Sequence, residues 1–276
     1  MNTSVVTPSP AQPPASATDL VVERVRHSLS ARHLQVVRRT PVSPGFVRLT
    51  LAGADLAGFA SAGFDDHLKL ILPQPGQERP SLPSMVDGRP VFPNPRPVLR
   101  DYTPARFDAD AGELDIEVAL HDAGPASDWA ATAFVGQWVG IAGPRGSLVI
   151  PTGFDWHWLI GDETALPAIA RRLSELRAGT TATVRIQVRN PADQRLLTSA
   201  ATLDVEWVSD LPAAVERLTL PVGAGYIWAA GEHADMAAVR KAVLAKPGVD
   251  AKRMRIAAYW KRGAADHHED LVSAAG

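Results

Sequence analysis

The first residues whose types and spacing could do chemistry lie in the stretch 98–106, where Arg100, Tyr102 and Thr103 follow an apolar approach. Side chains alternate along a β-strand, so we expect Arg100 and Tyr102 on one face and Thr103 on the other. A guanidinium can bind a phosphate, a phenol ring can stack on a flat heterocycle, and a hydroxyl can hydrogen-bond its edge. The stretch therefore suits a flavin nucleotide, although an ordinary polar-edged strand has the same composition.

A second segment, residues 124–130, predicts a glycine turn that opens a helix over 127–134. The N–H groups of a helix's first turn have no partner inside the helix, so they form a ready site for a pyrophosphate. His121 ends the strand before this turn. A buried, hydrogen-bonded histidine is the commoner role for such a residue, and a contact with the nucleotide is the alternative.

A third group of residues follows predicted strands in the second half of the chain. Gly161-Asp162-Glu163-Thr164 joins a buried strand to a helix, and Gly231 lies at a similar strand end. Ligands of parallel sheets bind at the carboxyl ends of the strands. The segment lacks the spacing of the glycine fingerprint for dinucleotides, so an ordinary strand-to-helix turn remains the alternative.

Arg189 follows the second predicted strand of this half, with Arg195 a few residues later. An arginine at this place can bind the additional phosphate of NADPH, whereas an acidic residue would bond the ribose of NAD. The sequence favours NADPH on this ground. Two ordinary surface arginines are the alternative.

The elements that must position these residues divide the chain into two predicted domains. After a disordered tail at 1–18, residues 19–150 predict a short helix at 19–31 and then an antiparallel β-barrel, because turn clusters separate strands without helices between them. Its strands are expected at 33–40, 46–51, 67–72, 100–107, 113–121, 138–141 and 147–150. The stretch 73–97 contains eight prolines and predicts a long mobile loop without regular structure.

Residues 151–276 alternate between strands and helices, which favours a parallel α/β sheet. Strands are expected at 158–161, 183–188, 204–208, 226–230 and 254–260, and helices at 164–176, 212–217 and 234–244. A solvated C-terminal helix is expected around His267-His268. Consecutive side chains on a helix do not face one another, so this pair and its acidic neighbours predict no metal site. We expect Trp156, Trp158 and Trp207 to pack against the sheet.

Composition sets further bounds on the 276-residue chain. No apolar run reaches the roughly 18 residues of a membrane span, and the net charge of −2 gives no general attraction to nucleic acid. The absence of cysteine excludes disulfides, thiol catalysis and thiolate-bound iron–sulfur clusters. Electrons would then travel on an organic cofactor. The tail has no basic start or apolar core of a signal peptide, so the chain is expected in the cytoplasm.

The motifs, taken in order, resemble those of the siderophore-interacting proteins. The resemblance runs from about His33 to Asp270 and rests on Asp65-x-His67-x-Lys69-Leu70, Arg100-x-Tyr102-Thr103, His121, Gly124-Pro125-x-Ser127-x-Trp129, Gly143-Pro144-x-Gly146-Ser147, Gly161–Ile169, Trp228–Glu232 and Tyr259–Gly263. These proteins are FAD-dependent ferric-siderophore reductases of the ferredoxin-reductase superfamily. One departure is that Ala105 stands where the family carries a second arginine, with Arg106 one position later.

The resemblance implies roles for individual residues. FAD would be bound by Arg100, Tyr102, Thr103, His121, Gly124, Pro125, Ala126, Ser127 and Trp129. The nicotinamide nucleotide would be bound by Gly161, Asp162, Glu163, Thr164, Arg189, Gly231 and Glu232. Lys69, Arg145 and Arg262 would form a positive mouth for an anionic ferric siderophore.

The function implied is transfer of electrons from NADPH or NADH through FAD to the Fe(III) of a siderophore, which releases Fe(II) for use inside the cell. The cofactor supplies the chemistry, so no catalytic side chain is expected. A monomer is expected. Two alternatives remain: a reductase for ferredoxin or flavodoxin, and a non-enzymatic module that binds flavin or siderophore.

Overall fold

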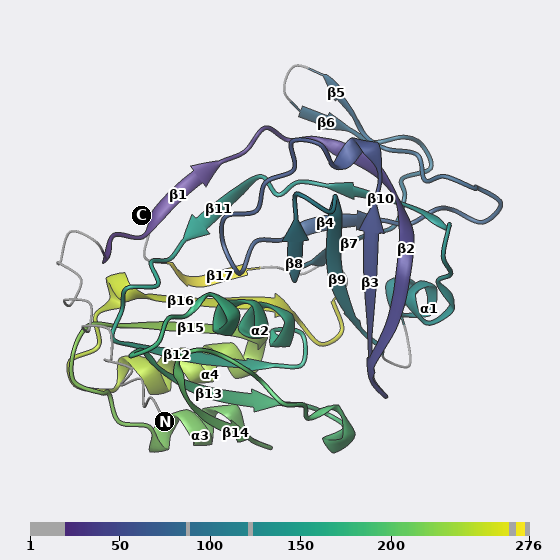
Figure 1. Cartoon of the computed structure of the whole chain (residues 1–276). Helices are drawn as coiled ribbons and strands as arrows, with labels where there is room; N and C mark the ends of the chain where they lie inside the picture. The colour runs from purple at the N-terminus through teal and green to yellow at the C-terminus, as the bar shows by residue number, and fades with distance from the viewer. Residues whose placement is uncertain (1–19, 87–88, 121–123, 265–268, 274–276) are drawn as a thin grey trace, which may run out of the picture.

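The structure is a computed structural model that describes residues 20–86, 89–120, 124–264 and 269–273. Three predictions lie outside these residues: the disordered tail, the role of His121, and the pair His267-His268. The described chain forms two large β-sheets that lie against each other, with helices mainly on the second, and two further two-stranded sheets (Figure 1).

The first sheet is antiparallel, curled, and has the strand order β7-β4-β10-β2-β3-β9-β8 (Figure 1). Its strands are β2 (Ala31–Ser43), β3 (Phe46–Ala52), β4 (Leu68–Ile71), β7 (Leu99–Tyr102), β8 (Arg106–Asp108), β9 (Glu113–Ala119) and β10 (Trp138–Ala142). A short 3₁₀ helix, Ala54–Leu56, follows β3, and helix α1 (Pro125–Thr132) follows β9.

Alternating apolar residues place the core of this sheet inside the curl. Leu34 and Val36 on β2 are fully buried, and so are Leu114 and Ile116 on β9. Two alanines of α1, Ala126 and Ala130, pack into the same core and close one side of it. Apolar residues at every second position of a strand lie on one face of a sheet, and here that face is the inside of the curl. The predicted antiparallel barrel class is confirmed.

The segment predicted as one strand at 100–107 is in fact two strands at opposite edges of the sheet. β7 pairs with β4 and β8 pairs with β9. Between them lies Thr103-Pro104-Ala105, and Pro104 has no N–H to donate to a ladder. The break turns the chain from one edge of the curled sheet to the other.

Two other predictions in the first half are wrong. The expected helix at 19–31 is replaced by strand β1 (Glu23–Arg26), which pairs with β11 (Gly146–Val149), so a distant partner overrides the helical pattern. The proline-rich stretch is not without regular structure, since β5 (Ser84–Val86) and β6 (Arg89–Val91) pair within it. A two-stranded ribbon tolerates Pro90 because each strand has one edge without ladder bonds.

The second sheet has the order β14-β13-β12-β15-β16-β17. Its strands are β12 (Trp156–Asp162), β13 (Thr181–Gln187), β14 (Thr202–Trp207), β15 (Gly225–Glu232), β16 (Met254–Trp260) and β17 (Glu269–Ser273). The first five are parallel, as predicted, whereas β17 is antiparallel to β16. The expected C-terminal helix is therefore wrong in its described part, where an edge strand stands instead.

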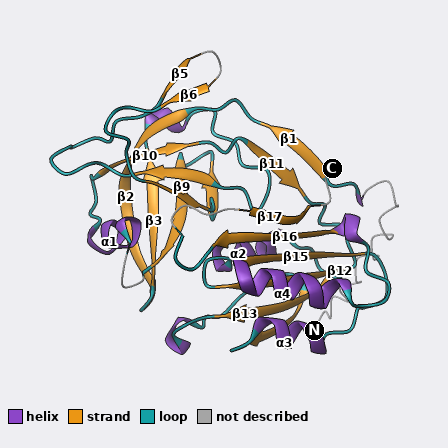
Figure 2. Ribbon diagram, turned by 180° about the vertical axis from the view of Figure 1, so that it is seen from behind, coloured by secondary structure: helices purple, strands orange, loops and turns teal. Residues whose placement is uncertain are grey.

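Helices cover both faces of this sheet (Figure 2). Helix α2 (Leu166–Glu175) packs on one face through Leu166, Ile169 and Leu173. Helices α3 (Leu211–Arg217) and α4 (His233–Leu244) pack on the other through a separate apolar cluster. Two 3₁₀ helices, Pro191–Asp193 and Ala251–Arg253, complete this half, and no helix of the described chain is long and apolar enough to cross a membrane.

The two sheets are joined by a buried carboxylate. Asp65, which precedes β4, lies against the second sheet with its side chain 2% exposed. Its Oδ2 accepts a hydrogen bond of 3.0 Å from the indole of Trp228 and lies 2.7 Å from Nε of Arg255. Phe64 meets the same Trp228 ring edge-on. A buried charge is stable only when paired and hydrogen-bonded, so this contact fixes how the sheets meet.

We predict that Asp65→Ala lowers the free energy of unfolding by about 3 kcal/mol. Breaking a buried ion pair leaves the other charge uncompensated, although Arg255 keeps its second partner, Asp270. The matched control is Arg217→Met, whose partner Glu206 is exposed, so its expected cost is under about 1 kcal/mol. Urea unfolding measures both variants. Equal stability of Asp65→Ala and the parent would show that Asp65 does not hold the sheets together.

Candidate functional site

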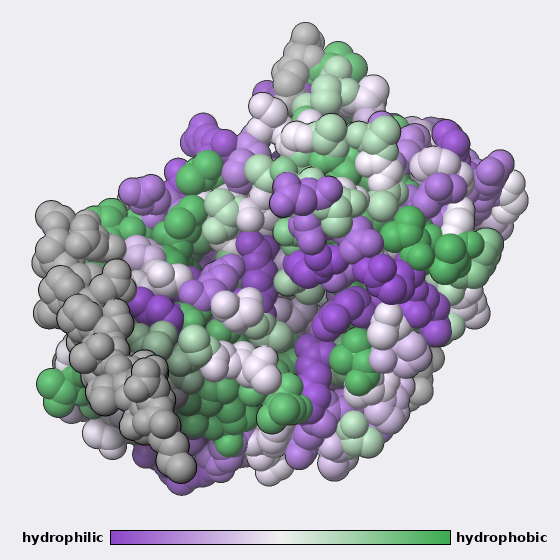
Figure 3. Space-filling view, in the orientation of Figure 1, coloured by the Kyte–Doolittle hydropathy of each residue, from purple (hydrophilic) through white to green (hydrophobic). Residues whose placement is uncertain are grey.

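A cavity of about 480 Å³ lies where the curled sheet meets the second sheet. Both halves of the chain line it, since its walls come from β3, β7, β9 and the start of α1 on one side and from the ends of β12, β13 and β16 on the other. On the face in Figure 3, hydrophilic residues form a band near this junction. The carboxyl ends of the parallel strands open here, as the sequence predicted.

β7 supplies the wall on the barrel side. Arg100, Tyr102 and Thr103 all line the cavity, and Arg100 and Tyr102 stand opposite Leu70 and Leu68 of β4, on one face of the sheet. The ring of Tyr102 packs partly against the barrel core, and this burial raises its pKa to about 12. The phenol therefore stays protonated and neutral at physiological pH.

The turn before α1 brings one glycine to the cavity. Gly124 lines it with φ of 152°, which favours glycine over other residues. The rest of the predicted segment stands behind this wall: Ala126 and Ser127 are buried, and Trp129 packs against the barrel core. Pro125 occupies the first helical position and does not line the cavity.

On the nucleotide side, Asp162 acts as a buried brace. Its Oδ1 accepts hydrogen bonds from the backbone N–H and the hydroxyl of Thr164, at 2.8 and 2.6 Å. Its Oδ2 accepts from the backbone N–H of Glu232 and from the indole of Trp260, at 2.9 and 2.8 Å. Burial raises the pKa of Asp162, while these donors oppose the shift. Thr164 and Trp260 line the cavity, so Asp162 positions them from behind.

The two glycines at these strand ends allow close packing rather than ligand contact. A Cβ on Gly161 would lie 2.5 Å from the carbonyl oxygen of Ala230, and one on Gly231 would lie 2.8 Å from Oδ2 of Asp162. Glu232 accepts hydrogen bonds from the first N–H groups of α4 and, at 3.1 Å, from the backbone N–H of Arg262. None of the three lines the cavity.

Charges in the lining are unevenly paired. Its three acids all have partners: Glu163 pairs with Arg189, Asp101 with Lys69, and Glu117 with Arg48 and Arg195. Arg100 donates only to the carbonyl of Leu99 within the described chain. Lys261 and Arg262 also line the cavity. The balance is cationic, although the whole chain has a net charge of −2.

The three residues predicted to form the mouth are not placed alike. Arg262 is exposed and lines the cavity. Lys69 pairs with Asp101 at 2.9 Å and lies beside the lining, not in it. Arg145 is exposed in the turn between β10 and β11, three residues after Ala142, which stands opposite Lys69.

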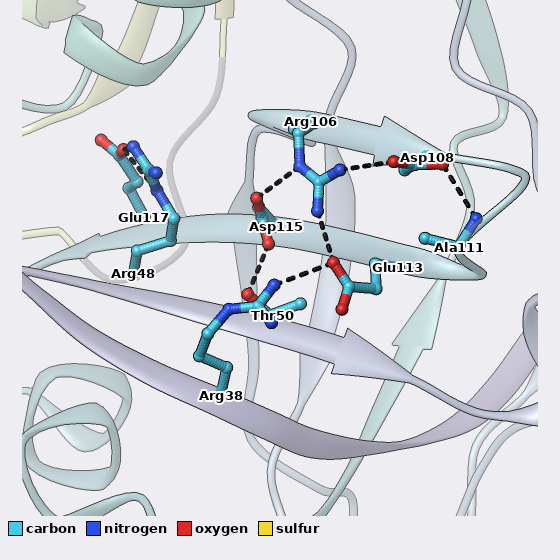
Figure 4. A network of polar contacts seen from close by, with 9 residues as sticks. All are labelled: Arg38, Arg48, Thr50, Arg106, Asp108, Ala111, Glu113, Asp115 and Glu117. Atoms are coloured by element: carbon cyan, nitrogen blue, oxygen red, sulfur yellow. Dashed lines mark hydrogen bonds and ion pairs between the residues drawn. The ribbon is translucent and has the colours of Figure 1, made fainter.

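Arg106 does not supply the missing second arginine. Its guanidinium faces away from the cavity and contacts Asp108, Glu113 and Asp115 at 2.8, 2.6 and 2.8 Å. Figure 4 shows this network on the strands β8 and β9, with Thr50 and Arg38 joining it from below. Three carboxylates neutralise Arg106, so the displaced arginine serves the edge of the sheet.

Several lining residues were not predicted as site residues. They are Phe46, His67, Asp101, Glu117, Ala119, Pro167, Tyr259, Trp260, Lys261, Gly263 and Ala264. Those from 259 to 264 lie at the end of the last parallel strand or just after it, and the rule for parallel sheets could have found them. Phe46 and Glu117 come from barrel strands whose alternation carries no signal of ligand contact.

The residues present fit a flavin dinucleotide. The cavity size is typical of ligand sites, and its walls hold aromatic rings from Tyr102, Tyr259 and Trp260. Among the described residues the guanidinium of Arg100 has no carboxylate partner, which suits a phosphate. The start of α1 beside Gly124 adds first-turn N–H groups, which favour anions.

Comparison with known proteins agrees with this geometry. Residues 35–148 match the model of the siderophore-interacting FAD-binding domain, and residues 154–263 match that of the siderophore-interacting protein. The NADPH-dependent ferric-chelate reductase of Escherichia coli is 37% identical over 86% of this chain and 96% of its own length. The chain belongs to the siderophore-interacting protein family. The predicted family, fold class and FAD cofactor are thereby confirmed.

Two further members of the family show the extent of the likeness. The ferric vibriobactin reductase of Vibrio cholerae is 31% identical over 90% of this chain and 95% of its own length. The crystal structure of a siderophore utilization protein from T. fusca superposes with a TM-score of 0.81 and 35% identity, covering 90% of this chain and 98% of that one. The match therefore extends over both large sheets.

Proposed function

We propose that this protein is a ferric-siderophore reductase that passes electrons from NADPH through FAD to chelated Fe(III). The observation that carries the proposal is the cationic cavity between an FAD-binding barrel and the carboxyl ends of a parallel sheet, in a member of the siderophore-interacting family. Hard oxygen donors bind Fe(III) better than Fe(II), so reduction loosens the chelate and frees the iron.

The chain's own residues bind and orient in this mechanism. FAD, when bound, accepts a hydride and gives up electrons one at a time. Arg100 and the start of α1 would hold its phosphates, and Tyr102 forms an uncharged wall because its pKa is raised to about 12. Trp260, held by Asp162, lines the cavity at the end of the parallel sheet and would help to exclude water there. No side chain needs to move a proton.

We predict that Arg100→Ala weakens FAD retention by roughly ten- to hundredfold, because a hydrogen bond to a charged group contributes about 1.5–3 kcal/mol. Equilibrium titration of the apoprotein with FAD, followed by flavin fluorescence, measures the dissociation constant. Arg38→Ala is the matched control, since Arg38 is an exposed arginine of the same sheet paired with Glu113. Unchanged FAD affinity in Arg100→Ala would remove Arg100 from the site.

Arg189 is the proposed contact for the additional phosphate of NADPH. It is exposed, lines the cavity at the end of β13, and is held by Glu163 through both its side chain and its backbone N–H. The bond to Glu163 uses Nε, and the described residues make no bond to the two terminal nitrogens, which would be available to a ligand. Arg195, predicted as its helper, pairs with Glu117 of the barrel instead.

We predict that Arg189→Ala raises the half-saturating concentration of NADPH at least tenfold and that of NADH by less than about twofold, since only NADPH loses a charged contact. Stopped-flow reduction of the bound FAD at several concentrations of each donor measures both constants. The NADH series serves as the internal control. An equal change in the half-saturating concentrations of the two donors would mean that Arg189 does not bind the additional phosphate of NADPH.

The acceptor is proposed to meet positive charge around the cavity. Arg262 stands in the lining, Lys69 lies on β4, and Arg145 lies in the turn that follows the neighbouring strand β10. A ferric tris-catecholate is strongly anionic, so such a rim would steer it toward the flavin even though the chain is slightly acidic.

We predict that Arg262→Glu and Lys69→Glu each slow reduction of an anionic ferric tris-catecholate severalfold at low salt, while the rate of FAD reduction by NADPH stays within about twofold. Trapping of Fe(II) by a coloured chelator measures the rate. Arg217→Glu, on α3, makes the same change in net charge away from the cavity. If Arg217→Glu slowed the reaction as much, only the overall charge would matter and the rim would be elsewhere. The reduction rate of each rim variant should also depend less on salt, because fewer attractive charges remain to be screened. The screening length is roughly 8–10 Å at 0.1–0.15 M salt.

A further inference from the structure

We propose that residues 190–195 form a positioning strap that fastens the NADPH side of the cavity to the barrel wall and thereby sets the approach of the donor to FAD. The inference rests on the proposed function and concerns two residues of the strap, Asp193 and Arg195. Neither lines the cavity. Both cross from the second sheet to the first.

Asp193 binds the turn between β2 and β3. Its Oδ1 accepts hydrogen bonds of 2.7 Å from the hydroxyl of Ser43 and 2.7 Å from the backbone N–H of Gly45. The carboxylate is buried, at 7% exposure. A Cβ at position 45 would meet the carboxylate of Asp193, which would have to shift to accept a larger residue than glycine. The side chain of Asp193 and the backbone of the β2–β3 turn are therefore in close contact.

Arg195 binds the wall of the cavity itself. Its Nη2 lies 2.6 Å from Oε2 of Glu117 on β9, and its guanidinium stands 5.7 Å from the ring centre of Phe46 on β3. Glu117 is 3% exposed, and Arg195 is 15% exposed. Phe46 and Glu117 both line the cavity. The strap therefore contacts side chains that face the cavity. Solvent screens the Arg195–Glu117 ion pair little, because both side chains are mostly buried.

The strap is also stiff and directly connected to the donor site. It begins one residue after Arg189, which lines the cavity. Asn190 caps the 3₁₀ helix Pro191–Asp193 by accepting from the backbone N–H of Ala192, and the N–H of Asp193 bonds to the carbonyl of Asn190. A capped turn cannot stretch as a loose loop can, so the strap fixes the distance between Arg189 and the barrel wall. Without the strap, Arg189 and the nucleotide that it holds would shift together relative to the barrel, and the contact between them would persist.

A second anchor explains why the strap matters. Asp65 joins the sheets through Trp228 and Arg255 on β15 and β16, whereas the strap joins them beyond β13. Arg171 on α2 adds a third contact, because it donates to Ser61 and to the carbonyl of Pro104. Separated contacts prevent rotation about any one of them. Transfer between two bound reactants is steeply sensitive to their placement, and a shift of about 1 Å can cost roughly a hundredfold in rate. Loss of the strap should therefore reduce the rate of transfer and not the affinity for either ligand.

The experiment uses the FAD-loaded protein and four strap variants. Asp193→Ala removes the acceptor, whereas Asp193→Asn keeps an oxygen that can accept from Ser43 and Gly45. Arg195→Met removes the charge, whereas Arg195→Lys keeps it. Arg217→Met, an exposed arginine on α3, is the matched control. Stopped-flow reduction by NADPH gives the limiting rate and the half-saturating concentration, and hydrogen–deuterium exchange of the peptide 43–47 reports whether the strap is docked.

We expect Asp193→Ala and Arg195→Met to lower the limiting rate of FAD reduction by about ten- to hundredfold. The half-saturating NADPH concentration should stay within about twofold, and FAD should be retained. Asp193→Asn and Arg195→Lys should recover most of the rate. Exchange at residues 43–47 should be faster in Asp193→Ala than in the parent, because the amide of Gly45 loses its acceptor.

Three results would overturn the strap while leaving the proposed function standing. The first is an unchanged limiting rate in both Asp193→Ala and Arg195→Met, and the second is a fall of the same size in Arg217→Met. The third is a rise in half-saturating NADPH at an unchanged limiting rate, which would make the strap part of the binding site. A parent protein that NADPH does not reduce would instead reject the proposed function itself.

Discussion

The structure depends on one buried carboxylate between two sheets. Asp65 belongs to the first half of the chain, and its carboxylate contacts the second sheet. There it accepts a hydrogen bond from the indole of Trp228 and pairs with the guanidinium of Arg255. Because an unpaired charge in this place would cost several kcal/mol, the sheets have one stable way to meet. The cavity is the space that this arrangement leaves between the edge strand β7 and the ends of β12, β13 and β16.

The cavity lies between two halves of the chain that suit different ligands. The barrel offers an edge strand and a helix start, which suit a flavin with its pyrophosphate. The parallel sheet offers strand ends, which suit a nicotinamide nucleotide. Residues such as Asp162 and Glu232, which are polar and lie in the motifs, brace the lining from behind, so the motif of this family specifies the supports as well as the contacts.

The fold classes of both halves could be predicted from sequence because they follow from local patterns. Apolar and polar residues alternate along the barrel strands, and strands alternate with helices after Pro151. The errors concern strands whose pairing the local pattern does not show. β1 pairs with residues more than a hundred positions away, and β17 is an edge strand of a sheet whose pattern ends before it. Arg106 meets its three carboxylates in the hairpin formed by β8 and β9, which the prediction of a single strand at 100–107 did not allow. Arg100, Tyr102 and Thr103 were found because they lie within four consecutive residues.

The measurement that tests the central claim most directly is an anaerobic titration of the purified yellow protein. The account predicts that NADPH bleaches the flavin absorbance, and that a ferric siderophore then restores it while Fe(II) appears at two per flavin, because a reduced flavin holds two electrons and each Fe(III) takes one. Flavin that stays oxidised with NADPH, or reduced flavin that the ferric chelate does not reoxidise, would contradict the account.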